Sequence, residues 1–195
     1  MGRIIPSTII ENAAPSQKTA YLQLDSNLLY RQTLNNCAPY SAMAVINLLT
    51  GKLLDPELLA RQTTWRVEKN LTLPQGLLGL LAKYTIKTRE SVLNIFSASE
   101  KINWLKNRII ARHPVILLVK VHHVQHFLTV LGYNEQGFFL YDSMQDKSPG
   151  NPRKTRVDSE VLSGNRFYAN AELLGLWDSA GAGPFYRNWA VECSI

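Results

Sequence analysis

The residues best suited to chemistry in this sequence are centred on one cysteine, Cys37, at the start of an expected helix. An Asn-Asn pair before it ends a polar stretch, and the apolar run from Pro39 to Leu49 is closed by Gly51. A thiol in the first turn of a helix meets unpaired backbone N–H groups and the positive end of the helix dipole, which favour the thiolate. Because the thiolate is the nucleophilic form, Cys37 is the candidate nucleophile. A lone cysteine is more often a small core residue, so further residues must support this interpretation.

Catalysis by a thiol also needs a base that carries the proton and a group that orients this base. Among the four histidines, His126 stands directly before the apolar run FLTVLGY. A polar side chain at the start of such a strand is expected at the edge of a sheet, facing a cleft. His113 is predicted to cap the end of a helix, and His122 and His123 are predicted to be exposed. His126 is therefore the candidate base.

Asp142 directly follows the run FFLY, which is expected to form a hairpin with the strand after His126. A three-residue loop in the turn NEQG would place Asp142 opposite Val130, on the same face as His126. A two-residue loop would place it opposite Thr129, on the other face. The Asn-x-x-Gly spacing favours the longer loop, with the glycine in a left-handed conformation. Strand twist or a bulge near Gly132 must then bring Asp142 up to the histidine.

An oxyanion at the attacked carbonyl would need hydrogen-bond donors beside the thiol. The backbone N–H of Cys37 at the helix start is one natural donor. The side-chain amide of Gln32, five residues upstream, is a second candidate, although an ordinary surface glutamine is the default for such a residue.

Hydrophobic patterning predicts a mainly helical first half and a mostly antiparallel β second half, which is an α+β fold. We expect one domain, 1–195, in which 1–112 carries the cysteine and 113–195 carries the histidine and the aspartate. Asp55-Pro56 is the expected start of the second helix. The other expected helices cover about 37–49, 77–84, a segment through Ile102, Leu105 and Ile109, and 171–178. The expected strands cover 115–121, 127–133, 138–142 and the C-terminus, with a short strand at 21–25. Residues 87–96 are expected to form a strand or a loop, and residues 143–166 a long loop.

The composition is that of a globular chain, with 195 residues, 46% hydrophobic and 18% charged. No apolar run approaches the roughly 18–20 residues that span a bilayer, and the N-terminus lacks the apolar core of a signal peptide. A cytoplasmic location is the default expectation, although a secreted mature fragment would look the same.

The net charge of +6 comes from scattered Lys and Arg residues, so we expect a solvated basic surface and no nucleic-acid partner.

Two cysteines could form one disulfide, but Cys37 is expected to be free and Cys193 to be an inert residue of the last strand. The histidines at 122–126, together with Asp142, are ligand types that zinc accepts, but they lack a cysteine pair and helical i, i+4 spacing. Zinc is therefore an alternative, and the favoured site needs no metal or cofactor.

The combination of Gln32 with NNCAPYSAMAVINLL and HFLTVLGYNEQGFFLYDS resembles the papain-like cysteine peptidases related to the double-glycine leader peptidases, including stand-alone relatives without a transporter. The resemblance covers about residues 20–145. It implies a papain-like fold with Cys37 as nucleophile, His126 as general base, Asp142 as orienting group and Gln32 as oxyanion donor.

Two positions depart from the pattern of this family. Ala38 follows the cysteine where the family commonly has glycine, and Gln32 lies five residues before the cysteine where papain-like enzymes often have six. Asn35 or Asn36 could therefore take the place of Gln32 as oxyanion donor.

These residues predict a cysteine peptidase that hydrolyses a bond in a peptide or protein substrate through a thioester acyl-enzyme. The same triad could transfer the acyl group to an amine, as in a transamidase or acyltransferase. A non-catalytic peptide-binding domain is the alternative from another class. The loop 143–166 is expected to border the cleft, where Arg153 and Lys154 would favour acidic groups of a substrate.

Overall fold

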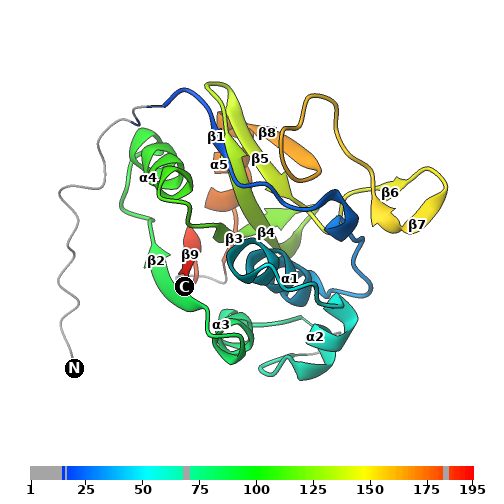
Figure 1. The fold of residues 1–195 in the computed structure, drawn as a ribbon. Coiled ribbons are helices and arrows are strands. Elements are labelled where there is room, and N and C mark those ends of the chain that lie inside the picture. Colours follow the sequence, from blue (N-terminus) through cyan, green and yellow to red (C-terminus); the bar gives the residue numbers. More distant parts are fainter. Residues whose placement is uncertain (1–14, 16, 68–70, 182–184) are drawn as a thin grey trace, which may run out of the picture.

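An antiparallel, seven-stranded sheet forms the centre of the molecule in the computed structural model, which describes residues 15, 17–67, 71–181 and 185–195 (Figure 1). The strand order is β2-β9-β3-β4-β5-β8, and β1 pairs with β4 outside this path. The helices are α1 (Cys37–Thr50), α2 (Pro56–Gln62), α3 (Pro74–Lys83), α4 (Ala98–Ile110) and α5 (Asn170–Asp178), with a 3-10 turn η1 (Ser26–Leu28); the strands are β1 (Ala20–Tyr21), β2 (Lys87–Val92), β3 (Val115–Val121), β4 (Val124–Tyr133), β5 (Gly137–Tyr141), β6 (Lys147–Ser148), β7 (Asn151–Thr155), β8 (Arg166–Ala169) and β9 (Trp189–Ser194).

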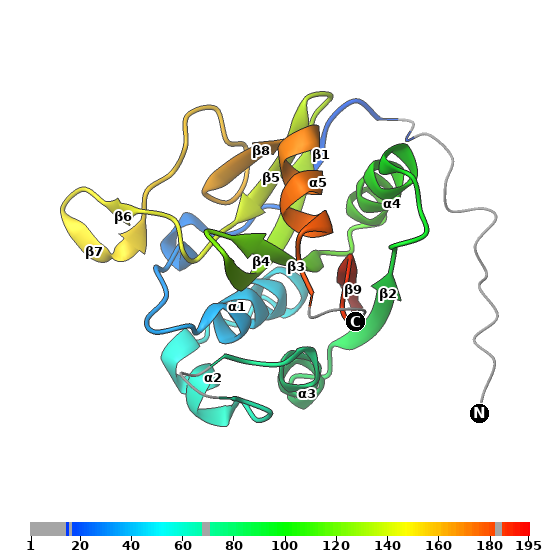
Figure 2. The same ribbon diagram turned by 180° about the vertical axis from the view of Figure 1, so that it is seen from behind.

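Helices cover both faces of this sheet (Figures 1 and 2). α1 and α3 pack on one face, in a buried cluster that includes Met43, Leu80 and Phe127. α4 and α5 pack on the other face, in a cluster built around Trp104 and Trp177. Successive residues of β3 alternate between the two clusters, which explains why VILLVKV is a continuous apolar run. The predicted α+β class is confirmed.

α1 is the helix that carries Cys37, and it is buried from its first residue to Ile46. Its apolar run therefore reflects burial along most of its length rather than one amphipathic stripe. The helix ends at Gly51, whose φ of 71° is the left-handed conformation typical of a helix C-cap. The side chain of Ser41 donates a hydrogen bond to the Phe127 carbonyl of β4 at 3.3 Å, which fixes the helix against the strand of the expected base.

The β4–β5 hairpin differs in register from the expectation. Its turn pairs Tyr133 with Phe138, which is one residue away from the pairing expected of a three-residue loop. In this register alone, Asp142 would lie opposite Thr129, on the face away from His126. The expected loop length was therefore wrong.

A β-bulge in β4 returns Asp142 to the face of the sheet on which His126 lies. The register shifts by one residue between Val130 and Gly132. Extended to Asp142, the shifted register places this residue opposite Leu128, on the same side of β4 as His126. Of the two expected alternatives, strand twist or a bulge near Gly132, the structure has the bulge, and it brings Asp142 two residues nearer to the histidine than the expected register would.

The turn itself is held by Asn134, whose side chain accepts hydrogen bonds from the N–H groups of Gln136 and Gly137 at 2.9 Å each. Gly137 does not have a positive φ, so the expected left-handed glycine was wrong. A side chain is excluded there for another reason, because a Cβ atom would lie 2.1 Å from the Tyr168 carbonyl oxygen of β8.

Several segments differ in extent from the expectation. The 143–166 segment is not one loop but contains the β6–β7 hairpin, which projects from the body of the molecule (Figure 1). The 21–25 segment contributes only Tyr21 to a strand, and 87–96 contains β2. β8 was not expected from its four mixed residues. The sequence also predicts an irregular or extended lead-in over residues 1–30 and a turn at 181–184; residues 1–14 of the first and 182–184 of the second lie outside the described residues.

Candidate active site

Cys37 is the first residue of α1 and is buried, with 5% of its surface exposed. Asn36 is the N-cap residue, but its side chain makes no capping hydrogen bond to the helix. Within the described chain, the backbone N–H of Cys37 has no acceptor. The thiol therefore lies beside unpaired N–H groups at the positive end of a helix, which favours both a thiolate and a nearby oxyanion.

His126 and Asp142 form a buried hydrogen-bonded pair. His126 Nε2 lies 2.8 Å from Asp142 Oδ1, with the histidine fully buried and the aspartate 3% exposed. This leaves Nδ1, which makes no well-formed hydrogen bond within the described chain. The Cys37 side chain is near enough to His126 to influence its protonation. Contacts between a base and its nucleophile often tighten only when substrate binds.

The charges around His126 favour the imidazolium form. Burial lowers the pKa of His126, but the Asp142 carboxylate and the Cys37 side chain raise it, and the net result is a pKa of about 10 instead of 6.5. Burial also raises the pKa of Asp142, while the charge and hydrogen bond of His126 bring it below its ordinary 3.8. At neutral pH the pair is therefore ionised on both sides, which is the state that stabilises a neighbouring thiolate.

Asp142 is held by two residues that the sequence did not single out. Its backbone N–H donates to Asn165 Oδ1, and Asn165 Nδ2 donates back to the Asp142 carbonyl, each at 2.8 Å. The Met144 N–H donates to Asp142 Oδ1, also at 2.8 Å. The carboxylate thus has a fixed direction before any substrate binds.

Gln32 lies beside the residue that follows Asp142. Its backbone N–H donates to the Ser143 carbonyl at 2.8 Å, and its side-chain Oε1 accepts a hydrogen bond from the Ser143 hydroxyl at 2.7 Å. With Oε1 occupied, the amide orientation is fixed, and Nε2 has no acceptor among the described residues. A third hydrogen bond, from the Tyr141 hydroxyl to the Tyr30 carbonyl at 2.7 Å, joins the same two segments.

With Gln32 as the oxyanion donor that the resemblance implies, replacing Ser143 by alanine is expected to lower kcat about tenfold while KM changes little, because the Gln32 amide loses the bond that orients its Nε2. Ser143→Thr keeps the hydroxyl and is the matched control, with kcat expected near that of the wild type. Steady-state kinetics on one peptide substrate measure both values. Equal kcat in Ser143→Ala and the wild type would show that this hydroxyl does not orient a working donor.

The side chain of Asn36, the alternative donor, is engaged elsewhere. Its Nδ2 donates to Thr33 Oγ1 at 3.0 Å, and its Oδ1 accepts a hydrogen bond from Arg66. Asn35 has a φ of 54°, a left-handed conformation that asparagine tolerates better than most residues. The two asparagines thus shape the turn that leads into α1.

A known protein family covers most of the sequence. The model of the Peptidase_C39 like family matches residues 17–170. The chain belongs to this family. No curated protein sequence matches the chain at a significant level.

Solved structures of C39 peptidases share the fold. A putative C39-like peptidase from Bacillus anthracis has 14% identity and a TM-score of 0.53, over 92% of this chain and 98% of its own. The peptidase domain of Streptococcus ComA, a bi-functional ABC transporter involved in quorum sensing, has 13% identity and a TM-score of 0.53, over 91% and 98%. A double glycine motif protease from an AMS/PCAT transporter, solved with its leader peptide, has 11% identity and a TM-score of 0.53, over 89% and 93%.

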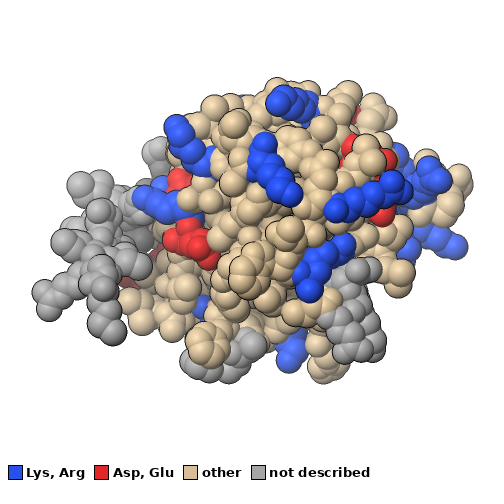
Figure 3. Space-filling model, turned by 90° about the horizontal axis from the view of Figure 1, so that it is seen from below, with Lys and Arg blue, Asp and Glu red and all other residues tan. Residues whose placement is uncertain are grey.

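The predicted papain-like fold is thus confirmed, and the chain has the family and fold of cysteine peptidases. None of the helices in the described part of this C39-family chain combines the length and apolar character needed to cross a membrane. Lys and Arg residues on the face shown in Figure 3 mostly lie apart from one another, among uncharged side chains.

The other cysteine and the other histidines of this C39-family chain lie outside the pair. Both cysteines are free thiols, and burial raises the pKa of Cys193. His113 does not use its ring as a helix cap, because Nδ1 lies 2.5 Å from Glu192 Oε1. His122 and His123 are exposed, as predicted, in the turn between β3 and β4. In the described residues, no group of three or more His, Cys, Asp or Glu could hold a metal ion.

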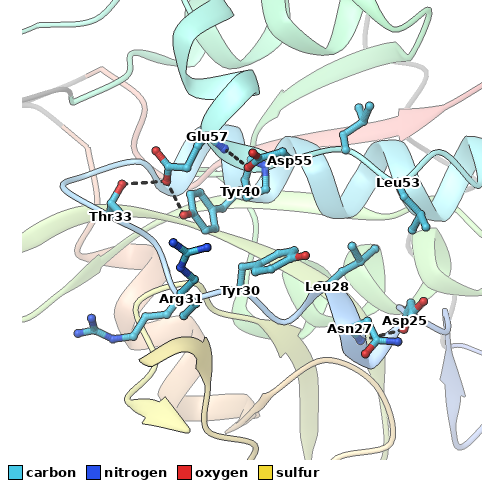
Figure 4. Close-up of a pocket in the computed structure, with 13 residues that line it drawn as sticks. Asp25, Asn27, Leu28, Tyr30, Arg31, Thr33, Tyr40, Leu53, Asp55 and Glu57 are labelled. Carbon is cyan, nitrogen blue, oxygen red and sulfur yellow. Dashed lines mark hydrogen bonds between the residues drawn. The ribbon is translucent and has the colours of Figure 1, made fainter. Parts of the chain in front are cut away.

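A pocket of about 780 Å³ lies beside the N-terminal half of α1 (Figure 4). Its walls come from the segment 25–33, from Tyr40, from residues 53–57 and from Arg153 of β7. On its upper wall, Thr33 and Tyr40 both donate to Glu57, at 2.9 and 2.5 Å. The pocket therefore reaches α1 at Tyr40, three residues after Cys37, and Arg153 lines it, whereas Lys154 lies over the Tyr30 ring.

Proposed function

We propose that this C39-family chain is a cysteine peptidase that hydrolyses a peptide bond with Cys37 as nucleophile, His126 as acid and base, and Asp142 as the group that orients the histidine. The observation that carries the proposal is the buried imidazole, whose Nε2 is bonded to Asp142 while Nδ1 is left for the thiol at the start of α1. Most buried polar side-chain atoms in proteins have a hydrogen-bond partner, so an imidazole nitrogen without one at this depth calls for an explanation, and a role toward the thiol supplies it.

In the proposed reaction, the Cys37 thiolate attacks the carbonyl carbon of the scissile bond. The oxyanion is stabilised by the Cys37 N–H and by Gln32 Nε2. The imidazolium of His126 then gives its Nδ1 proton to the departing amine, the C–N bond breaks, and a thioester remains. Neutral His126 takes a proton from water as the oxygen attacks the thioester, and the acid product and the thiolate are released.

The substrate class is a peptide or protein. One solved relative is a double glycine motif protease in complex with a leader peptide. Peptides that contain a double-glycine site are therefore the first substrates to test. Mass analysis of the products with and without an added amine separates hydrolysis from acyl transfer, because only an acyltransferase gives the amide.

The direct test is labelling with iodoacetamide or an E-64-type probe, followed by peptide mapping. We expect the adduct on Cys37 and none on Cys193, and no adduct in Cys37→Ala. In His126→Ala, alkylation of Cys37 at pH 6 to 7 is expected to slow by about tenfold or more, because the imidazolium no longer stabilises the thiolate. An unchanged pH dependence of Cys37 alkylation in His126→Ala would show that the two residues are not a catalytic couple.

A further inference from the structure

A chain of hydrogen bonds connects Asn36, the residue before Cys37, to Glu57 of α2. Arg66 donates through Nη2 to Asn36 Oδ1, and Asn36 Nδ2 donates to Thr33 Oγ1. The Thr33 hydroxyl in turn donates to Glu57 Oε1, which also accepts from the Tyr40 hydroxyl (Figure 4). Asn36 is buried, with 6% of its surface exposed, so its amide orientation depends on these partners.

Arg66 is placed by the segment between α2 and α3. It forms an isolated β-bridge with Thr72, and the Leu73 N–H donates to the Trp65 carbonyl at 3.0 Å. The Arg66 guanidinium also donates through Nη1 to the Ala60 carbonyl of α2 at 3.2 Å. A half-buried guanidinium with backbone and side-chain contacts on both sides is fixed in place rather than free to sample solvent.

The guanidinium is also within electrostatic range of the thiol. Partial burial lowers the pKa of Arg66, and the negative charges of the Cys37 thiolate and of Glu57 act in the opposite direction. By reciprocity, the positive charge on Arg66 favours the thiolate over the thiol. Two cationic groups thus act on the thiol, His126 from β4 and Arg66 from the α2–α3 segment. Asp142 is hydrogen-bonded to His126, and the charge of Glu57 acts on Arg66.

We propose that Arg66 is a positioning residue for the nucleophile, which holds the Asn36 side chain before α1 and supplies a second fixed positive charge beside the Cys37 thiolate. The proposal rests on the proposed function of Cys37. The thiolate then has two cations within electrostatic range, the imidazolium of His126 and the guanidinium of Arg66. Because arginine stays charged throughout the working range, its contribution does not vary with pH, whereas that of His126 does.

The test measures the rate of Cys37 alkylation by iodoacetamide against pH in folded variants. Arg66→Gln keeps a donor for Asn36 but removes the charge, and Arg66→Met removes both. For these variants we expect the midpoint of the rate profile to move up by about 0.5 to 1 pH unit. Arg66→Lys keeps the charge and is expected to stay closer to the wild type than either. Arg61→Gln, an exposed arginine of α2, is the matched control with a wild-type profile.

A wild-type midpoint in Arg66→Gln, with an unchanged unfolding temperature, overturns the proposal. Equal shifts in Arg66→Gln and Arg66→Lys also overturn it, since charge would then be irrelevant. If neither neutral variant folds, Arg66 is a structural residue and the proposal fails. Failure of the proposed function gives a different result: alkylation of wild-type Cys37 would not respond to His126→Ala, while the Arg66 series would still show whether the guanidinium acts on the thiol.

Discussion

Replacing Cys37 by alanine is expected to lower peptide hydrolysis by about 10⁴-fold or more, because the covalent route is lost while the rest of the site remains. The free energy of unfolding is expected to fall by only about 1 kcal/mol, the cost of removing one buried heavy atom. The thiol makes no disulfide, and α1 stays fixed by its buried apolar residues. Steady-state kinetics and thermal unfolding measure the two effects separately.

Cys193→Ala is the matched control for this experiment, because it removes a buried thiol from β9 rather than from α1. We expect it to lose a similar amount of stability and to keep its hydrolytic activity. Residual hydrolysis in Cys37→Ala within a factor of about 100 of the wild type would contradict a covalent mechanism through this residue.

Replacing Asp142 by alanine is expected to damage stability and activity together. Removing one partner of a buried ion pair leaves the other charge uncompensated, at a cost of about 3–5 kcal/mol in free energy of unfolding. Asp142→Asn can still accept from the His126 and Met144 donors, so it is expected to lose less stability. Its hydrolysis is nevertheless expected to fall by about 10²–10⁴-fold, since a neutral amide no longer stabilises the imidazolium.

The pH dependence of this effect follows from the two pKa shifts. The pKa of His126 is raised in the folded state from 6.5 to about 10, so its stabilisation is complete below pH 6.5 and is lost as pH rises through 10. The pKa of Asp142 is lowered from 3.8, so its stabilisation is present above 3.8 and is lost as pH falls through the folded value. The stability difference between wild type and Asp142→Ala should therefore be largest between about pH 4 and 9. Denaturant unfolding at several pH values measures this difference in free energy of unfolding. A difference that stayed constant from below pH 4 to above pH 9 would contradict an ionised pair of His126 and Asp142.

Local signals in the sequence were sufficient to predict several elements. Asp55 caps α2 by accepting from the Glu57 N–H at 2.9 Å, and Pro56 is the first residue of the helix, as its fixed φ favours. The start of α1 at Cys37 and its end at Gly51 also follow from short-range residue preferences. Such signals act within one turn of chain, so they do not depend on the rest of the fold.

The register of the β4–β5 hairpin could not be derived in the same way. The turn residues favour a loop length that the structure does not have, and the pairing of Tyr133 with Phe138 at the turn would by itself place Asp142 on the face away from His126. The bulge in β4 returns it to the face of His126. A bulge near Gly132 was one of two expected ways, with strand twist, of joining His126 and Asp142, and no local signal in the sequence chose between them. At Gly132 a Cβ atom would lie 2.5 Å from that of Tyr21, so the close approach of β1 explains the glycine.

The supporting residues of the site were missed because each acts across a long stretch of sequence. Ser143 is 111 residues from Gln32, Asn165 is 23 from Asp142, and Arg66 is 30 from its partner Asn36. Serine, asparagine and arginine are common on surfaces, and no local pattern marks one of them as a partner in a buried site. Only the folded arrangement identifies them.

The bulge in β4 also limits how the length of this chain can vary among relatives. Within the paired parts of β4 and β5, the insertion or deletion of a single residue would turn the carboxylate to the opposite face of the sheet unless a second irregularity compensated for it. Length changes in these two strands are therefore compatible with the site only in even numbers or together with the gain or loss of a bulge, whereas the turn between them can change length without moving the register. An alignment that counts strand length apart from turn length would thus separate relatives able to assemble the pair from those that carry the same residues without the means to join them.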